Sequence, residues 1–304
     1  LSREQTYPCL SSLNQIEHIH LSAWMDALLT ERLHTKTQRI FHILDEAQQD
    51  WNTAFYITLA RNFGFGINSE PFEQLARSLP LAIIRKHRDN VVQTEALFFG
   101  QAGFLDETDI TDDYYKRLQQ EYLFLQKKYT LEHTYPASAF KRLRTRPGNF
   151  PHLKIAQLAA LSMHDEFLFS RLLEADSITE LKQLFTAAPS AYWKTHFHFR
   201  NSAAEADKPL SSKSIEIILI NTAVPILFAY SIQRSRPEYN EKALRLLEAL
   251  PPEKNAIVST FAHAGLSATN AGESQALIQL RKEYCDRKKC LYCRIGHRIL
   301  KRKT

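Results

Sequence analysis

The sequence predicts an all-α protein, an irregular multi-helix bundle with a cysteine-rich turn near its C-terminus, called here the cysteine knuckle (residues 285–296). Glycine accounts for only 8 of the 304 residues, and strong helix formers are abundant. Apolar side chains recur at steps of three and four residues, which is the helical period. Because 44% of the residues are apolar, the chain has enough material for a core. We expect one helical domain over residues 1–304.

Helical periodicity begins near residue 22 and continues along most of the chain. The first expected helix has an apolar face starting at Trp24 and a charged face opposite it. Polar residues such as Asp112 and Ser177 stand where helix caps are expected. The expected helices are about 22–44, 50–62, 69–78, a short helix around 83–85, 91–100, 112–131, 152–164, 165–174, 177–187, 238–250, 253–265 and 272–285.

Two segments need separate interpretation. Residues 214–235 are the most apolar stretch, which we interpret as a buried helix kinked at Pro225 and too short and interrupted to span a membrane. In residues 193–199, His196 and His198 alternate with aromatic residues, so a short strand would place both imidazoles on one face. Two histidines make an incomplete metal site, and we expect them to form core hydrogen bonds instead.

Three of the four cysteines lie close together near the C-terminus, in the pattern Cys-x4-Cys-x2-Cys formed by Cys285, Cys290 and Cys293. The fourth, Cys9, lies near the other end. A Cys-x2-Cys turn brings two thiolates to one ion, and zinc takes four such ligands. Nearby cations favour thiolates, and Gly296 permits a backbone bend. We expect a zinc site that joins the chain ends through all four cysteines.

Alternatives to this zinc site remain open. His297 competes with Cys9 as the fourth ligand, although chain ends often lie close together in a domain. The same spacing also occurs around iron–sulfur clusters. A third interpretation is a set of free thiols in a reduced cytoplasmic protein, with no metal. The cytoplasm is the expected location in every case, because no signal peptide is visible at the start.

Positive charge is concentrated in two places. The net charge is +6, and residues 281–304, a basic cysteine-containing tail, hold ten Lys or Arg against two acidic residues. A second group comprises Arg142, Arg144 and Arg146, in a loop just before the helix at 152–164. Cations beside a helix N-terminus favour anion binding. A solvated tail and a loop paired with acidic residues are the alternatives.

Catalytic motifs are missing from the sequence. It contains no nucleophile elbow, P-loop or complete zinc-hydrolase pattern. The catalytic candidates are His164, Asp165 and Glu166, or alternatively His196 and His198. Residues 164–166 are expected on a helix, where neighbours point in different directions. A solvated helix surface is therefore the favoured interpretation, and the sequence favours a non-catalytic chain.

Several stretches together resemble the bacterial domain-of-unknown-function 2851 family. They are Pro8-Cys9, residues 95–103 (EALFFGQAG), residues 146–151 (RPGNFP), the set Trp193, His196 and Phe199, and residues 290–296 (CLYCRIG). The resemblance spans nearly the whole chain. It implies a C-terminal helical portion of a longer protein, in line with a first residue that is Leu1 rather than Met. It implies no activity and no catalytic residue.

Three functions fit these observations. The first is a helical module with a structural metal site that binds nucleic acid or an acidic partner through its basic segments. The second is the substrate-holding part of a nuclease-like enzyme whose catalytic region would precede residue 1. The third is a protein–protein scaffold, which predicts an exposed apolar patch. No membrane association is expected, and the oligomeric state is left open.

Overall fold

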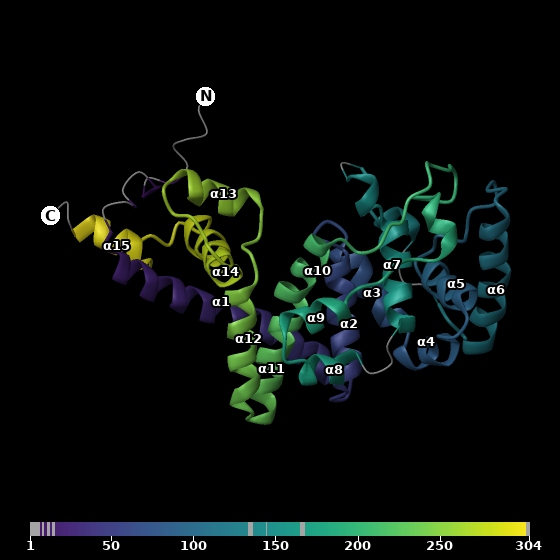
Figure 1. The fold of residues 1–304 in the computed structure, drawn as a ribbon, viewed down its shortest axis with the longest axis horizontal. Helices are drawn as coiled ribbons and strands as arrows, with labels where there is room; N and C mark the ends of the chain where they lie inside the picture. The colour runs from purple at the N-terminus through teal and green to yellow at the C-terminus, as the bar shows by residue number, and fades with distance from the viewer. Residues whose placement is uncertain are drawn as a thin grey trace. The chain divides into compact units, whose positions relative to one another are not determined.

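The computed structural model describes residues 7–301 except 8, 11–12, 14–15, 133–135, 144 and 165–167. Within these ranges every regular element is a helix, which confirms the all-α prediction (Figure 1). Contacts divide the chain into two compact units. Unit 1 comprises Leu1–Phe41 and Ala223–Thr304, and unit 2 comprises His42–Thr222.

Unit 1 combines both ends of the chain. Its helices are the first part of α1 (His18–Glu46), α11 (Val224–Arg234), α12 (Pro237–Ala249), α13 (Ala256–His263), α14 (Ala271–Gln279) with the π-helical turn η7 (Leu280–Cys285), and α15 (Arg294–Lys301). Apolar side chains of α1 pack with those of α13, α14 and α15 in one core that includes Trp24, Leu28, Phe261, Leu277 and Ile295. Purple α1 and the yellow C-terminal helices lie side by side in Figure 1.

Unit 2 contains α2 to α10 and holds the RPGNFP segment. The helices are α2 (Trp51–Phe63), α3 (Ser69–Ser78), α4 (Leu81–His87), α5 (Val91–Gln101), α6 (Asp113–Tyr129), α7 (Pro151–His164), α8 (Leu168–Glu174), α9 (Ile178–Leu184) and α10 (Ser212–Ile218). Several begin at capping side chains, because an oxygen of Asp50, Asp112 or Ser177 accepts a backbone N–H of the first turn. Gly100 of α5 is needed for close packing, since a Cβ there would lie 2.1 Å from the Tyr122 ring of α6.

The most apolar stretch is a continuous helix over Ser212–Arg234, in which the π-helical turn η6 (Leu219–Ala223) precedes Pro225. Proline deprives the carbonyl four residues earlier of its helical donor. That carbonyl belongs to Asn221, and the Asn62 amide donates to it at 2.9 Å. The helix has 23 residues and contains an apolar window long enough to cross a membrane, so the expectation that it is too short to span one is wrong. However, 72% of its apolar window is buried in the protein, as in a core helix.

The segment expected as a short strand forms a 3-10 turn instead, η5 (Ala191–Lys194), followed by an isolated bridge between His196 and Ser202. The His196 ring stacks on Tyr192 with centroids 4.0 Å apart, and its Nδ1 lies 3.0 Å from the Tyr192 carbonyl oxygen. Aromatic stacking and local hydrogen bonds thus replace strand pairing.

Candidate functional sites

The four cysteines all belong to unit 1 and gather around one part of its core. Cys293 is buried within the core, whereas Cys9 and Cys285 pack against it and Cys290 is exposed. All four are free thiols. Helix α14 and the π-helical turn position Cys285, and a backbone hydrogen bond from Cys293 N to Cys290 O closes the Cys-x2-Cys turn at 3.3 Å.

Residues beside Cys9 are fastened to the segment that precedes the knuckle turn. The Tyr7 hydroxyl donates to Asp286 at 2.6 Å, and Arg281 donates to the same carboxylate oxygen at 2.7 Å. The Arg281 guanidinium also lies 3.9 Å from the centroid of the Tyr7 ring. A hydrogen bond and a cation–π contact therefore hold Tyr7 close to Cys285, and the Arg281–Asp286 ion pair links the two residues that Tyr7 contacts.

Electrostatic coupling shows that the thiols are near one another. The pKa of Cys285 is raised to about 12, chiefly by burial and also by the thiols of Cys9, Cys293 and Cys290, while Arg281 acts to lower it. Burial also raises the pKa of Cys9, with Cys293 and Cys290 contributing. Even so, no group of three or more His, Cys, Asp or Glu side chains among the described residues is arranged to hold a metal ion.

Gly296 has a different role from the backbone bend expected of it. It is helical, in the first turn of α15, and a Cβ there would lie 2.3 Å from the Cys290 carbonyl oxygen. The Cys290 backbone therefore packs directly against Gly296, where a side chain would not fit. The left-handed backbone that the turn requires occurs at Lys288 instead, with φ of 54°. His297 is exposed at the surface of α15.

A second candidate site surrounds the RPGNFP segment in unit 2. The buried Asn68 side chain donates to the Lys141 carbonyl at 2.9 Å and accepts from the Lys141 N–H at 2.7 Å, which fixes the start of the loop. The loop ends in a 3-10 turn, η4 (Pro147–Asn149), that leads into α7. Asn68 thus holds a loop rather than capping α3, where it makes no side-chain cap.

Two depressions, of about 220 and 350 Å³, share Arg146, Asn149 and Lys154 as lining residues. Lys154 projects from an otherwise apolar part of α7 and is only 4% exposed. Burial lowers the pKa of its ammonium to about 8. The larger depression is also lined by Lys208 and Gln157. Neither lining contains an acidic side chain, so these depressions, called here the cationic depressions, carry only positive charge.

The loop arginines differ in their surroundings. Arg146 lines both cationic depressions, whereas the Arg142 guanidinium lies 5.8 Å from the Phe150 ring centroid and outside both linings. Arg144 lies outside the described residues. Anion binding by the three arginines stays a prediction. Lys154, Lys208 and Gln157 were not anticipated, although a lysine within the apolar run LKIAQLAAL was a usable signal.

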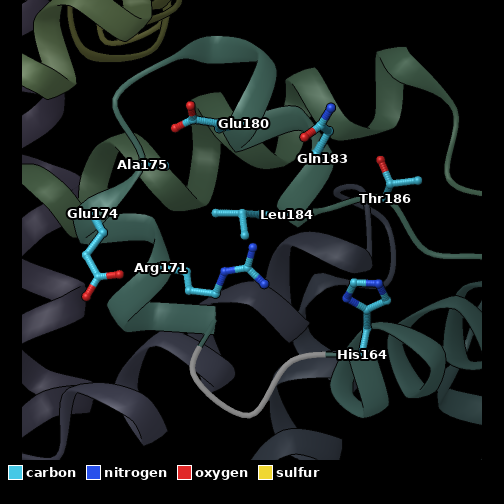
Figure 2. Close-up of a pocket in the computed structure, with 8 residues that line it drawn as sticks. All are labelled: His164, Arg171, Glu174, Ala175, Glu180, Gln183, Leu184 and Thr186. Atoms are coloured by element: carbon cyan, nitrogen blue, oxygen red, sulfur yellow. The ribbon is translucent and has the colours of Figure 1, made fainter.

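A pocket of about 600 Å³ lies in unit 2 between the end of α7, the second half of α8 and helix α9 (Figure 2). Its lining includes His164, Arg171, Glu174 and Glu180. In Figure 2 these side chains come from separate segments around an open space. Asp165 and Glu166 lie outside the described residues, so the expected His164-Asp165-Glu166 grouping is not addressed by the structure.

Buried polar groups in the EALFFGQAG segment and near Trp193 make hydrogen bonds and ring contacts within the core of unit 2. Glu95 accepts from Trp193 Nε1 at 2.9 Å and from the Tyr114 hydroxyl at 3.0 Å, and burial raises its pKa. His152 lies among aromatic rings, and burial lowers its pKa to about 3, with His198 and Arg142 contributing. These contacts join α5, α6, α7 and η5.

A family model described as a protein of unknown function, DUF2851, matches residues 1–256. This range includes Cys9, the EALFFGQAG and RPGNFP segments and both cationic depressions, and it stops before the knuckle. No curated protein and no solved structure matches the chain. The match covers most of the chain and agrees with the resemblance drawn from its motifs. The chain belongs to the DUF2851 family.

Proposed function

We propose that this chain is a non-catalytic helical module whose two ends are joined by one metal ion bound to Cys9, Cys285, Cys290 and Cys293. The carrying observation is the gathering of four free thiols from opposite ends of the chain around one core. Only Cys9 comes from the other end of the chain, so a ligand held in common would join segments that are distant in sequence. The Tyr7–Asp286–Arg281 contacts support the same closure.

The donor set suits zinc, which prefers four thiolates in closed structural sites. The sulfurs are gathered but not arranged as ligands, so binding requires side-chain rotations, which are small changes for exposed Cys290 and half-buried Cys9. Burial raises the pKa of Cys285 to about 12 and so opposes the thiolate, while Arg281 acts in the other direction, so metal binding has to displace the thiol proton. When bound, zinc would supply folding free energy rather than a reaction.

Elemental analysis of the purified chain, both as isolated and after reduction and reconstitution with zinc, tests this proposal. We expect one zinc per chain, and loss of zinc in Cys290→Ser and Cys9→Ser but not in His297→Gln. Limited proteolysis should then cut near both ends of Cys290→Ser while unit 2 stays intact. A wild-type chain without metal would contradict the site. Retention of zinc by Cys9→Ser would show that Cys9 is not a ligand. Iron in the isolated chain would indicate an iron–sulfur cluster instead of zinc.

A further inference from the structure

Several cations in unit 2 are neutralised by carboxylates. Arg200 pairs with Asp109, and Lys182 pairs with Glu216 at 2.8 Å. Arg77 pairs with the buried Glu73 at 2.9 Å. Paired cations of this kind are expected at a surface that only needs to be soluble. The cationic depressions break this pattern.

The partners of the two lysines in the cationic depressions are neutral. Lys154 Nζ donates to Gln157 Oε1 at 3.0 Å and lies 4.6 Å from the Phe65 ring centroid. Lys208 Nζ donates to the carbonyls of Trp193, at 2.8 Å, and Lys194, and lies 4.5 Å from the Phe197 ring centroid. Among the described residues, no carboxylate pairs with Lys154, Lys208 or Arg146. A buried ammonium without a counter-charge is costly unless an anion joins it.

The side-chain amide of Gln157 makes hydrogen bonds to both lysines. Its oxygen accepts from the Lys154 ammonium, and its nitrogen donates to the Lys208 carbonyl at 2.9 Å. Both cationic depressions also adjoin the start of α7, a helix of 14 residues whose first N–H groups attract negative charge. Positive charge from side chains and from the helix therefore converges on the wall that Arg146, Asn149 and Lys154 share.

We propose that the cationic depressions bind a nucleotide, with its phosphate at the wall formed by Arg146, Asn149 and Lys154. Aromatic residues line each depression, and the partly exposed ones are Phe65 in the smaller and Phe197 in the larger. Cations beside aromatic rings are typical of sites that hold a phosphate and stack a base. The nucleotide comes either free or as one unit of a single strand. This site is independent of the metal proposed in unit 1.

Titrations with adenosine monophosphate, with a labelled single-stranded oligonucleotide and with inorganic phosphate test the proposal, using the full chain at two salt concentrations. We expect Arg146→Gln and Lys154→Gln each to weaken nucleotide binding about tenfold or more, because each removes one charge-assisted contact. Each should also reduce the salt dependence of oligonucleotide binding by about one phosphate contact. Lys116→Gln, at an exposed position on α6, is the matched control and should bind like wild type.

The outcomes distinguish a free nucleotide from a single strand, and they include the results that would overturn the proposal. Binding of adenosine monophosphate identifies a free nucleotide, and binding of the oligonucleotide alone identifies a strand. Binding of inorganic phosphate alone overturns the nucleotide assignment. The site itself is overturned if no probe binds wild type, or if Arg146→Gln and Lys154→Gln bind like Lys116→Gln. Arg146 is exposed, so its variant keeps the test valid even if Lys154→Gln does not fold.

Discussion

The two positively charged regions of this protein differ in how their cations are satisfied. In the basic tail of unit 1, Arg281 pairs with Asp286, Arg287 pairs with Glu283 at 3.0 Å, and Arg294 lies 5.0 Å from the Trp24 ring centroid. In the cationic depressions of unit 2, charge is sparser but has no acidic partner. Charge density in a sequence is therefore an incomplete guide to binding, because binding also depends on which charges the fold leaves uncompensated.

A matched pair of glycine substitutions gives the largest expected contrast between these regions. Gly296→Ala places a Cβ against the Cys290 carbonyl oxygen, 2.3 Å away, and should lower the free energy of unfolding of unit 1 by about 3 kcal/mol. Gly148→Ala, in the loop beside the cationic depressions, meets no atom within 4 Å and should change stability little. Hydrogen exchange measured separately for residues in each unit checks this. Equal effects would mean that the knuckle does not close over Gly296.

Acid should act on unit 2 through His152. Its folded pKa of about 3 lies below the usual 6.5. Between these two pH values the unfolded chain therefore binds a proton at His152 and the folded chain does not. Stability is thus fully present above pH 6.5 and is lost as the pH falls, by about 2 kcal/mol at pH 5.

Urea unfolding of the wild type and of His152→Leu at pH 7 and pH 5 measures this loss. The variant should lose less stability in acid than the wild type. Its Leu also removes an imidazole whose Nδ1 has no hydrogen-bond partner among the described residues. Equal acid sensitivity of the two proteins would show that His152 becomes protonated without unfolding.

Carboxylates that accept from aromatic side chains allow a third comparison. Glu95→Gln in unit 2 keeps the shape but weakens the hydrogen bonds from Trp193 and Tyr114, and should cost about 1–2 kcal/mol because the site is buried. Glu31→Gln in unit 1 weakens the hydrogen bond from Tyr284, 2.8 Å long, at a half-exposed position and should cost less. Thermal unfolding of both variants checks the order, and a larger effect of Glu31→Gln would contradict it.

Helices were predictable here because periodicity and capping are local. The expected ranges 112–131 and 152–164 correspond to Asp113–Tyr129 and Pro151–His164. The assembly of unit 1 from both chain ends was anticipated only through Cys9, because no local pattern encodes contacts between residues so far apart. The role of Lys154 was missed since its burial depends on packing from α2 and the RPGNFP loop. The expectation of a short strand at 193–199 was wrong, because stacking of the aromatic rings outweighed the alternating sequence pattern.

The smallest expected effect is also the most direct test of the contrast between satisfied and unsatisfied charge. Lys154→Met removes a buried ammonium whose pKa burial lowers to about 8, and it should stabilise unit 2 by about 1 kcal/mol at pH 7. A folded pKa below the unfolded value of 10.5 means that the charge opposes folding below pH 8. That penalty disappears between pH 8 and 10.5, so the advantage of the variant should fade over the same range.

Thermal unfolding across this pH range measures the effect, with Lys116→Met as the exposed control. A stabilised variant that no longer binds nucleotide would show that the lysine is retained for its ligand and not for the fold. Destabilisation by Lys154→Met would instead indicate that the lysine stabilises the fold through its hydrogen bond to Gln157. The lysine would then be as internally satisfied as Arg281, Arg287 and Arg294 of the tail, and the distinction between the two regions would fail.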